Sequence, residues 1–447
     1  MKTTLYKSIS YLVLCGLFVS LCSRKSDKYL SQAILLVDSI DSKWQCYNAI
    51  GIIASHYADI GLHKQAVMYA NTIPDSSSRE HAFFLIAFTH FENGEIQRAL
   101  KTTESIISNK QKISTLTSFA YWYADSNYFE EASKILKRWR ELADSISNEY
   151  DYVYSIIQIA DVYIKMNESE IVDSLLTLAG SREMTINLAQ TYAKNNQIDK
   201  ALKIARKNYD IAKKYDNERQ RYSDLFPIVA VFVMCNKKDL ALDAVEYVSN
   251  TEYRGGLLAR IVKELVNTGR YDEGLDIVPL IKDSGWKEIA LRDVAMAYAK
   301  NGDYEESIEI IKMMKDASFI TGILCYMSKK YYEIEENAIA DNLLNDAFKI
   351  ADSTTNYYEK SIALFCIARE YIRRDMFDQA NDILTASFES AKLAEDNYKK
   401  DVLLFSICNG YANVHKYKEA DIAANEIKDN FNKILALLAI DTIRREQ

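Results

Sequence analysis

The sequence predicts an all-α solenoid, a stack of about eleven antiparallel helix pairs with a helical cap at each end. Three observations support this fold class. Pro occurs only three times and Gly 13 times in 447 residues, so the residues that break helices are scarce. Apolar residues recur at the spacing of a helix with one buried face. One pattern of aromatic, turn and small residues also repeats along most of the chain, with no linker dividing it.

The first 22 residues resemble a signal peptide. Lys2 and Lys7 precede an apolar stretch over residues 9–22, and Arg24 follows it. A membrane-spanning helix needs about 20 apolar residues, so this stretch is short for a permanent anchor. We therefore expect residues 1–22 to direct export, with the mature protein in the periplasm or outer membrane of a bacterial cell envelope.

The end of this stretch, Val19-Ser20-Leu21-Cys22, resembles a bacterial lipoprotein signal. In such signals a small residue precedes the Cys that becomes lipidated, and Leu21 departs from that pattern. We expect lipid attachment at Cys22. Ordinary cleavage after Cys22 or Ser23, and an uncleaved anchor, stay open as alternatives.

The repeat is built around an anchor residue, which is Tyr in eight of eleven repeats. Apolar residues lie seven, four and three positions before the anchor, on one predicted helix face. Four positions after it, Gly or Asn usually provides a residue that tolerates the left-handed conformation at a helix end. Nine positions after it, a small residue lets two helices approach closely. The anchors are Tyr57, His90, Tyr123, Tyr163, Tyr192, Phe232, Leu265, Tyr298, Tyr331, Tyr371 and Tyr411.

Successive anchors lie 29, 33 or 40 residues apart. The deviations from 33 are near-whole numbers of helical turns, so they keep the apolar stripe facing its neighbour. We expect the longer repeats to add one turn to each helix of the pair.

This order of aromatic, turn and small positions resembles the tetratricopeptide repeat (TPR), a unit of about 34 residues that forms two antiparallel helices. The resemblance covers residues 47–433. The family's Trp-like position is occupied here by residues such as Ile50 and Phe83, and its inter-repeat Pro is missing. The resemblance implies a right-handed superhelix whose concave surface, lined by the first helix of each pair, binds a protein or peptide.

The two ends of the repeat region need caps, because a terminal repeat would otherwise expose its apolar face. We expect an N-terminal capping helix within residues 28–46. Residues 434–447 are expected to form an unpaired final helix that packs back on the last pair through Leu435, Leu438 and Ile440.

The sequence contains no nucleotide-binding, metalloprotease or nucleophile-elbow motif, so we expect no catalytic residue and no cofactor. A net charge of −8 argues against a nucleic-acid partner. The cysteines beyond the N-terminal segment are expected to be small buried residues. The histidines lack the spacing of a ligand pair, so we expect no metal site and expect them to be solvated or to cap helices; they are His56, His63, His81, His90 and His415.

The groove positions that the resemblance implies change sign along the chain. The early ones carry Asp59, Glu92, Asp125 and Asp161, and Lys165 and Lys194 begin a basic region. The candidate binding residues are Arg260, Lys263, Arg292, Lys300, Lys329, Arg369 and Arg373, with Phe365 and Phe405 as apolar contacts. Such a surface suits an acidic protein or peptide; the alternative is a groove that only faces solvent.

We therefore expect an exported scaffold that binds a protein or peptide segment and touches the membrane only through a lipid at Cys22. Two alternatives stay open. One is an envelope enzyme that processes a carbohydrate or peptide on a helical solenoid. The other is a cytoplasmic regulatory TPR protein, which would require that the N-terminal segment is not a signal.

Overall fold

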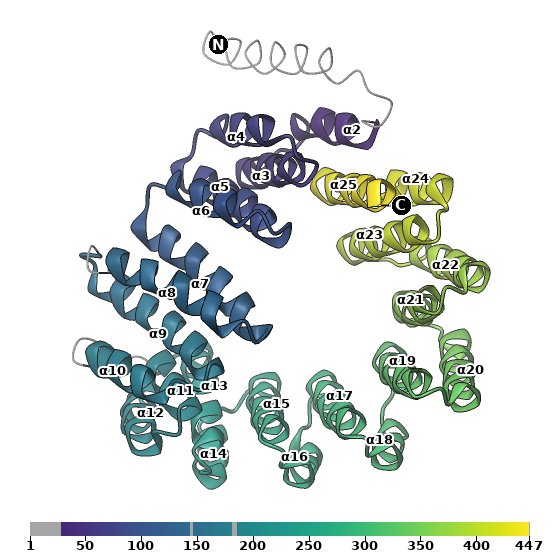
Figure 1. Cartoon of the computed structure of the whole chain (residues 1–447). Coiled ribbons are helices and arrows are strands. Elements are labelled where there is room, and N and C mark those ends of the chain that lie inside the picture. The colour runs from purple at the N-terminus through teal and green to yellow at the C-terminus, as the bar shows by residue number, and fades with distance from the viewer. Residues whose placement is uncertain (1–27, 144–145, 181–185, 447) are drawn as a thin grey trace. The chain divides into compact units, whose positions relative to one another are not determined.

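The computed structural model describes residues 28–143, 146–180 and 186–446, and every regular element in these ranges is a helix (Figure 1). The predicted signal segment and Cys22 lie outside the described residues. The chain forms two compact units: unit 1 combines the chain up to Ile106 with Ala317–Gln447, and unit 2 is Ile107–Asp316. The predicted all-α solenoid of helix pairs is confirmed.

Unit 2 is a continuous run of helix pairs in which the odd-numbered helix comes first. The first helices pack on one another in chain order from α7 to α17, and each contacts its own second helix. Within this unit the first helices α13, α15 and α17 form one layer, and the second helices α14, α16 and α18 form another layer beside it (Figure 1). The elements are α7 (Asn109–Asp125), α8 (Phe129–Ala143), α9 (Glu149–Lys165), α10 (Ser169–Gly180), α11 (Ile186–Lys194), α12 (Ile198–Ala212), α13 (Glu218–Met234), α14 (Lys238–Val245), α15 (Thr251–Asn267), α16 (Tyr271–Ile277), η1 (Val278–Leu280), α17 (Ser284–Asn301) and α18 (Tyr304–Ile311).

Unit 1 is assembled from both ends of the chain. Its first helices stack in the order α19, α21, α23, α25, α3 and α5, so the stack passes from the C-terminal to the N-terminal segment. The elements are α2 (Lys28–Val37), α3 (Lys43–Asp59), α4 (His63–Asn71), α5 (Ser76–Glu92), α6 (Ile96–Glu104), α19 (Ala317–Glu333), α20 (Asn337–Ser353), α21 (Tyr357–Arg373), α22 (Phe377–Lys392), α23 (Asn397–Asn413), α24 (Tyr417–Glu426) and α25 (Asn430–Glu446).

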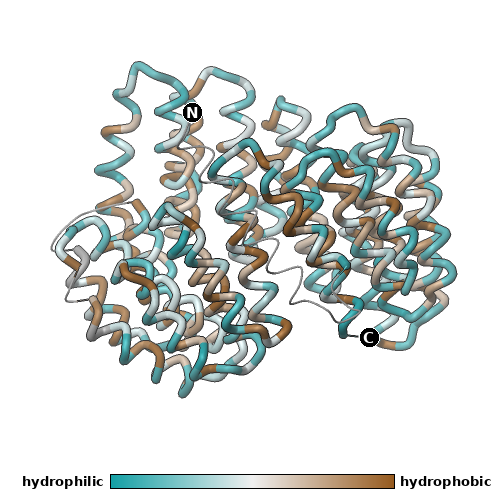
Figure 2. Tube along the Cα trace, turned by 90° about the horizontal axis from the view of Figure 1, so that it is seen from above, coloured by the Kyte–Doolittle hydropathy of each residue, from teal (hydrophilic) through white to brown (hydrophobic). Residues whose placement is uncertain are grey.

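The apolar and small positions of the repeat lie where the sequence places them. The tube is teal at many loops and brown along parts of many helices (Figure 2). The residues four positions before the anchors are all buried, each at most 1% exposed: Ile53, Ile86, Phe119, Ile159, Leu188, Ile228, Ile261, Val294, Met327, Ile367 and Ile407. The small residues nine positions after the anchors are all buried, from Ala66 to Ala420.

The turn between the two helices of each pair uses one conformation. All eleven residues four positions after an anchor have positive φ: Gly61, Gly94, Asn127, Asn167, Asn196, Asn236, Gly269, Gly302, Glu335, Asp375 and His415. The next backbone N–H then donates to the anchor's carbonyl, as from Leu62 N to Tyr57 O at 2.8 Å. This is the hydrogen bond of a left-handed helix end.

Helix lengths correct one expectation. Most first helices have 17 residues whatever the anchor spacing, and Ser, Asp or Asn caps many of them, as Asp75 does through Ser78 N. The 40-residue spacings instead lengthen only the second helix, to 15–17 residues in α8, α12, α20 and α22, against 7–9 in α4, α6, α14, α16 and α18. First helices share one stacked surface, so their length is held constant.

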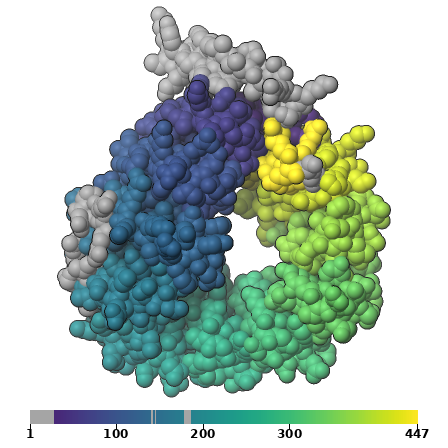
Figure 3. Space-filling model, in the orientation of Figure 1, coloured from purple at the N-terminus to yellow at the C-terminus, as the bar shows by residue number. Residues whose placement is uncertain are grey.

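The final helix α25 was expected to be unpaired, but it has a partner helix. The N-terminal helix α2 packs along α25 and also contacts α3, so it fills the place of α25's second helix. Lys28 Nζ lies 2.5 Å from Asp421 Oδ2, and Asn430 Nδ2 donates to Ser39 Oγ at 2.8 Å. Figure 3 shows the purple N-terminal and yellow C-terminal helices in contact. One helix pair of unit 1 is thus built from the two ends of the chain.

Two of the histidines that were expected to be solvated or to cap helices are buried. His56 is 6% exposed and His90 is 2% exposed, so neither is a solvated side chain.

Among the described residues, no helix combines the length and the apolar character that crossing a bilayer requires.

Candidate binding surface

The first helices of unit 2 pair many of their charges with one another. Lys165 on α9 forms an ion pair with Asp125 on α7, and Lys194 Nζ on α11 lies 3.0 Å from Asp161 Oδ1 on α9. Each pair joins neighbouring first helices. The acidic residues that the sequence places on this surface are therefore largely compensated by the lysines of the next repeat.

The basic candidates of unit 2 divide into two kinds. Arg260 lies 2.9 Å from Glu264 Oε1 and stacks over the Phe226 ring, while Arg292 lies 2.6 Å from Asp293 Oδ1. Lys263 on α15 and Lys300 on α17 are exposed, and neither has an acidic partner in the described part of the chain. Of the candidate residues in unit 2, these two lysines remain available to a ligand.

The basic candidates of unit 1 are mostly offset by acids. Lys329 Nζ lies 3.5 Å from Glu333 Oε1, and Arg373 forms an ion pair with Glu370. Burial raises the pKa of Glu370, although Arg373 and Arg369 act to lower it. Arg369 itself is exposed. The predicted basic surface is therefore weaker here than a count of cations suggests.

Sequence reasoning missed the two buried acids that offset these arginines. Glu264 and Glu370 each precede an anchor by one residue and are 7% and 3% exposed. A carboxylate one residue before the anchor, with Arg three or four residues away on the same helix, is the pattern that would have revealed them.

The two candidate aromatic contacts pack inward. Phe365 on α21 and Phe405 on α23 are half-buried and lie against the core of unit 1. A Cβ added at Gly410 would lie 2.6 Å from Leu384 Cδ2 and 3.3 Å from Phe365 Cε2, so α23 packs closely against both side chains at this point. Both rings therefore contribute to the packing of unit 1, and each keeps part of its surface exposed.

Unit 1 contains an acidic pocket of about 330 Å³ on its first helices. Asp59 Oδ1 accepts a hydrogen bond from Asn93 Nδ2 at 3.2 Å, and burial together with Asp59 raises the pKa of Glu92. Apolar side chains of α25 form another wall. The lining residues are Ile52, Ser55, His56, Asp59, Thr89, Glu92, Asn93, Leu435, Leu438, Ala439 and Thr442. This pocket suits a basic or amine group.

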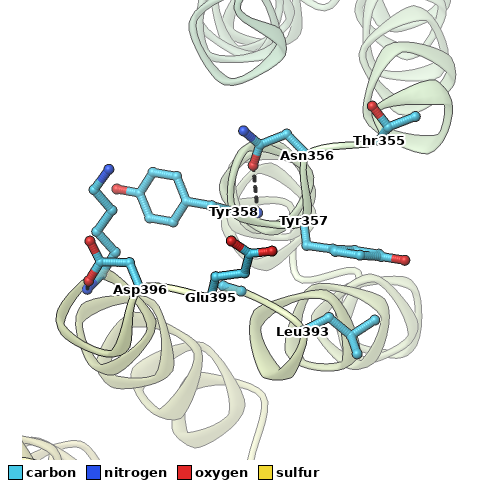
Figure 4. Close-up of a pocket in the computed structure, with 9 residues that line it drawn as sticks. Thr355, Asn356, Tyr357, Tyr358, Leu393, Glu395 and Asp396 are labelled. Atoms are coloured by element: carbon cyan, nitrogen blue, oxygen red, sulfur yellow. Dashed lines mark hydrogen bonds between the residues drawn. The ribbon is translucent and has the colours of Figure 1, made fainter.

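A second pocket of unit 1, of about 520 Å³, lies where α21 and α23 begin (Figure 4). Its polar atoms already serve the local fold. Asn356 Oδ1 accepts from Tyr358 N at 3.0 Å, Asp396 caps α23, and the Lys399 ammonium lies 5.2 Å from the Tyr358 ring centre. We therefore assign it no chemistry.

A third cluster joins His63, His90 and Glu95, which come from the start of α4, the anchor position of α5 and the residue before α6. His90 Nδ1 lies 2.8 Å from Glu95 Oε2, and His63 Nε2 lies 3.9 Å from Glu95 Oε1. Burial, with His63 nearby, lowers the pKa of His90. The sequence did not predict this cluster, because its members come from two helices and from the turn before a third, and share no short motif.

Comparison with known proteins gives similarities to helical repeat proteins. A PPR repeat family model matches residues 294–319. The chain is similar to Ton1535 from Thermococcus onnurineus NA1 (14% identity, 78% of this chain and 96% of that chain, TM-score 0.26). It is also similar to a chain of the APC/C hetero-tetramer Cut9–Hcn1 (13%, 97% and 98%, TM-score 0.27).

A further similarity is to the signal transduction ATPase PH0952 from Pyrococcus horikoshii, which has a tetratricopeptide repeat sensor (13%, 88% and 66%, TM-score 0.25). No curated protein sequence matches the chain. The fold assignment rests on the helix pairs of the structure itself.

Proposed function

We propose that this TPR-like solenoid is a protein-binding scaffold, and that the first helices of unit 2 hold an acidic segment of the partner. The observation that carries the proposal is the exposed pair Lys263 and Lys300, which lack acidic partners among the described residues although neighbouring charges are paired. A surface whose remaining charge is positive attracts carboxylates and disfavours cations.

The spacing of the two lysines defines the expected ligand. They lie on α15 and α17, which pack against each other. Axes of packed helices are about 8–10 Å apart. An extended peptide advances about 3.3 Å per residue, so acidic residues two or three positions apart match this separation.

The test uses labelled 12-residue peptides that differ only in having acidic, neutral or basic residues three positions apart. Fluorescence anisotropy should show that the acidic peptide binds most tightly and loses affinity as salt rises. Lys263→Glu with Lys300→Glu should weaken its binding at least about tenfold, or about 1.4 kcal/mol.

The matched control carries the same charge change on the outer helix α12. Lys203→Glu with Lys207→Glu replaces two exposed lysines and should leave the affinity unchanged. Equal affinity of both double variants for the acidic peptide would overturn the proposal.

A second candidate function is hydrolysis of a glycan or peptide in the acidic pocket of unit 1. It is supported by Asp59 and Glu92, two carboxyl groups that line the same pocket, and by the raised pKa of Glu92, which favours the form that a general acid requires. A screen of glycoside and peptide substrates tests it. Activity that Glu92→Gln abolishes would favour this function, and no turnover of any substrate would reject it.

We also propose export and lipid attachment at Cys22, on the strength of the basic and apolar N-terminal segment. The mature protein should partition into detergent, and Cys22→Ser should release it or leave the precursor uncut. Mass spectrometry of the mature N-terminus decides, because an unmodified N-terminus at another residue would reject lipidation.

A further inference from the structure

The repeat pattern changes character at one place in unit 1. The anchor of α5 is His90, where eight of the eleven anchors are Tyr. The second helix of the preceding pair begins with His63, and Glu95 precedes the second helix of His90's own pair. The helix turns of two successive pairs thus bring two imidazoles and one carboxylate together.

The three side chains are arranged as a partly enclosed ligand set. One ligand atom from each lies within 4.8 Å of the others, and the two imidazole rings are 4.8 Å apart. The His90 side chain is 3% exposed, while those of His63 and Glu95 are 28% and 31% exposed. His63 Nδ1 is buried with no hydrogen-bond partner in the described residues. His63 Nε2 lies 3.9 Å from Glu95 Oε1, beyond hydrogen-bond distance, so neither ring nitrogen of His63 has a hydrogen-bond partner among the described residues and either is available to a metal.

The distances are close to those of a metal site. Zinc binds His nitrogens and carboxylate oxygens at about 2.0–2.2 Å in tetrahedral geometry, which places ligand atoms about 3.4 Å apart. His90 Nδ1 lies 2.8 Å from Glu95 Oε2 and His63 Nε2 lies 3.9 Å from Glu95 Oε1, so the two separations fall on either side of that value and involve different oxygens of the carboxylate. Small side-chain rotations would equalise them.

We propose that His63, His90 and Glu95 bind a divalent transition-metal ion such as Zn²⁺. Two imidazoles and one carboxylate are a ligand set that zinc uses with one position left open, and the exposed side of the cluster leaves that position to water or to a partner's side chain. Arg98 Nη1 lies 2.5 Å from Glu95 Oε1, so Oε2, which lies against His90, is the carboxylate oxygen left for the metal. The ion would fasten α4, α5 and α6 together.

The test is titration of the untagged, metal-free protein with Zn²⁺ by calorimetry, together with its melting temperature. One equivalent should bind and raise the melting temperature, and a chelator should reverse the rise. Co²⁺ in place of Zn²⁺ should give d–d bands without a thiolate charge-transfer band, which separates this site from the free cysteines.

The informative variant is His90→Tyr, because it restores the residue that most repeats have at this position and should fold without metal. His90→Tyr, His63→Gln and Glu95→Gln should each weaken zinc binding by more than the 10–100-fold typical of losing an outer-shell partner. His81→Gln, a histidine outside the cluster, should bind as wild type. If wild type binds no zinc, or if His90→Tyr folds and binds zinc as tightly as wild type, the proposal is wrong.

Discussion

Three residues in the described part of the chain adopt positive φ although they are neither Gly nor Asn. They are Glu335, Asp375 and His415, and all three end the first helix of a pair. The left-handed conformation costs an L-residue roughly 1–2 kcal/mol, whereas Gly adopts it freely. The turn is therefore imposed at these positions by the packing of the two helices and not by the local sequence.

Replacing Glu335 with Gly should stabilise the protein. The gain should be about 0.5–1 kcal/mol, because removal of the steric cost is partly offset by Gly's greater freedom in the unfolded chain. Gly302→Ala should have the opposite effect and destabilise the protein. Its φ is +92° and no described atom lies within 4 Å of an added Cβ, so the cost comes from the backbone conformation and not from a collision. Chemical denaturation measures both, and a loss of stability in Glu335→Gly would contradict this account of the turn.

Asp441 forms a buried ion pair where the two ends of the chain meet. Its Oδ2 lies 3.0 Å from His56 Nε2 and 2.6 Å from Arg445 Nε, and its side chain is 1% exposed. Burial raises the pKa of Asp441, but the hydrogen bonds from His56 and Arg445 outweigh burial and hold it below the ordinary 3.8. A lowered folded-state pKa gives stability that is present above pH 3.8 and is lost as the pH falls through the folded value.

Asp441→Asn should accordingly destabilise the protein by about 1–3 kcal/mol at neutral pH, because two donors lose a charged acceptor in a buried site. The difference from wild type should persist at pH 5 and shrink below pH 3.8. Urea denaturation across this range provides the measurement. A difference that grows as the pH falls below 3.8 would show that the carboxylate does not stabilise the junction.

In each pair, the two helices can approach closely because the residue nine positions after the anchor is small. Ala340 and Ala338 lie two residues apart on α20, and Ala340 is fully buried while Ala338 is exposed. Ala340→Leu should cost about 1–3 kcal/mol through overpacking. Ala338→Leu should have little effect. Equal melting temperatures of the two variants would show that the helix crossing lies elsewhere.

The helices and turns could be predicted wherever the residues that specify them lie close together in the sequence. The buried row from Ile53 to Ile407 and the turn positions repeat every 29–40 residues and can be read without knowing the partner helix. The location of the extra turns was not predictable, because lengthening either helix preserves the apolar stripe equally well. Ion pairs such as Lys194 with Asp161 depend on the register between neighbouring helices, which sequence spacing does not specify.

At the scale of the molecule, unit 1 depends on contact between segments that are far apart in the chain. Lys28 and Asp421 are 393 residues apart in sequence and form an ion pair. The sequence predicted a helix at each end of the repeat region, because the residues there form an apolar helix face. An apolar face alone does not show which other helix packs against it. Pairing of α2 with α25 therefore became visible only in the structure.

Leu30→Ala should loosen both ends of the chain at once. Leu30 on α2 is 1% exposed, so the substitution should cost about 2–5 kcal/mol and raise hydrogen exchange in α25 as well as α2. Helices α13 and α15 of unit 2 should exchange as in wild type. Leu35→Ala on the same helix removes a side chain that is 64% exposed and should change little. Unaltered exchange in α25 after Leu30→Ala would contradict the shared helix pair.

On the whole molecule, we expect a partner to be held at the first-helix surface of unit 2. The most direct measurement is site-specific photocrosslinking in cells, with the crosslinking residue placed in turn at Lys263, Lys300, Lys203 and Lys207. We expect a discrete crosslinked protein from the two first-helix positions and none from the two positions on α12. Crosslinks of equal yield from all four positions, or from α12 alone, would contradict the claim that this surface binds the partner.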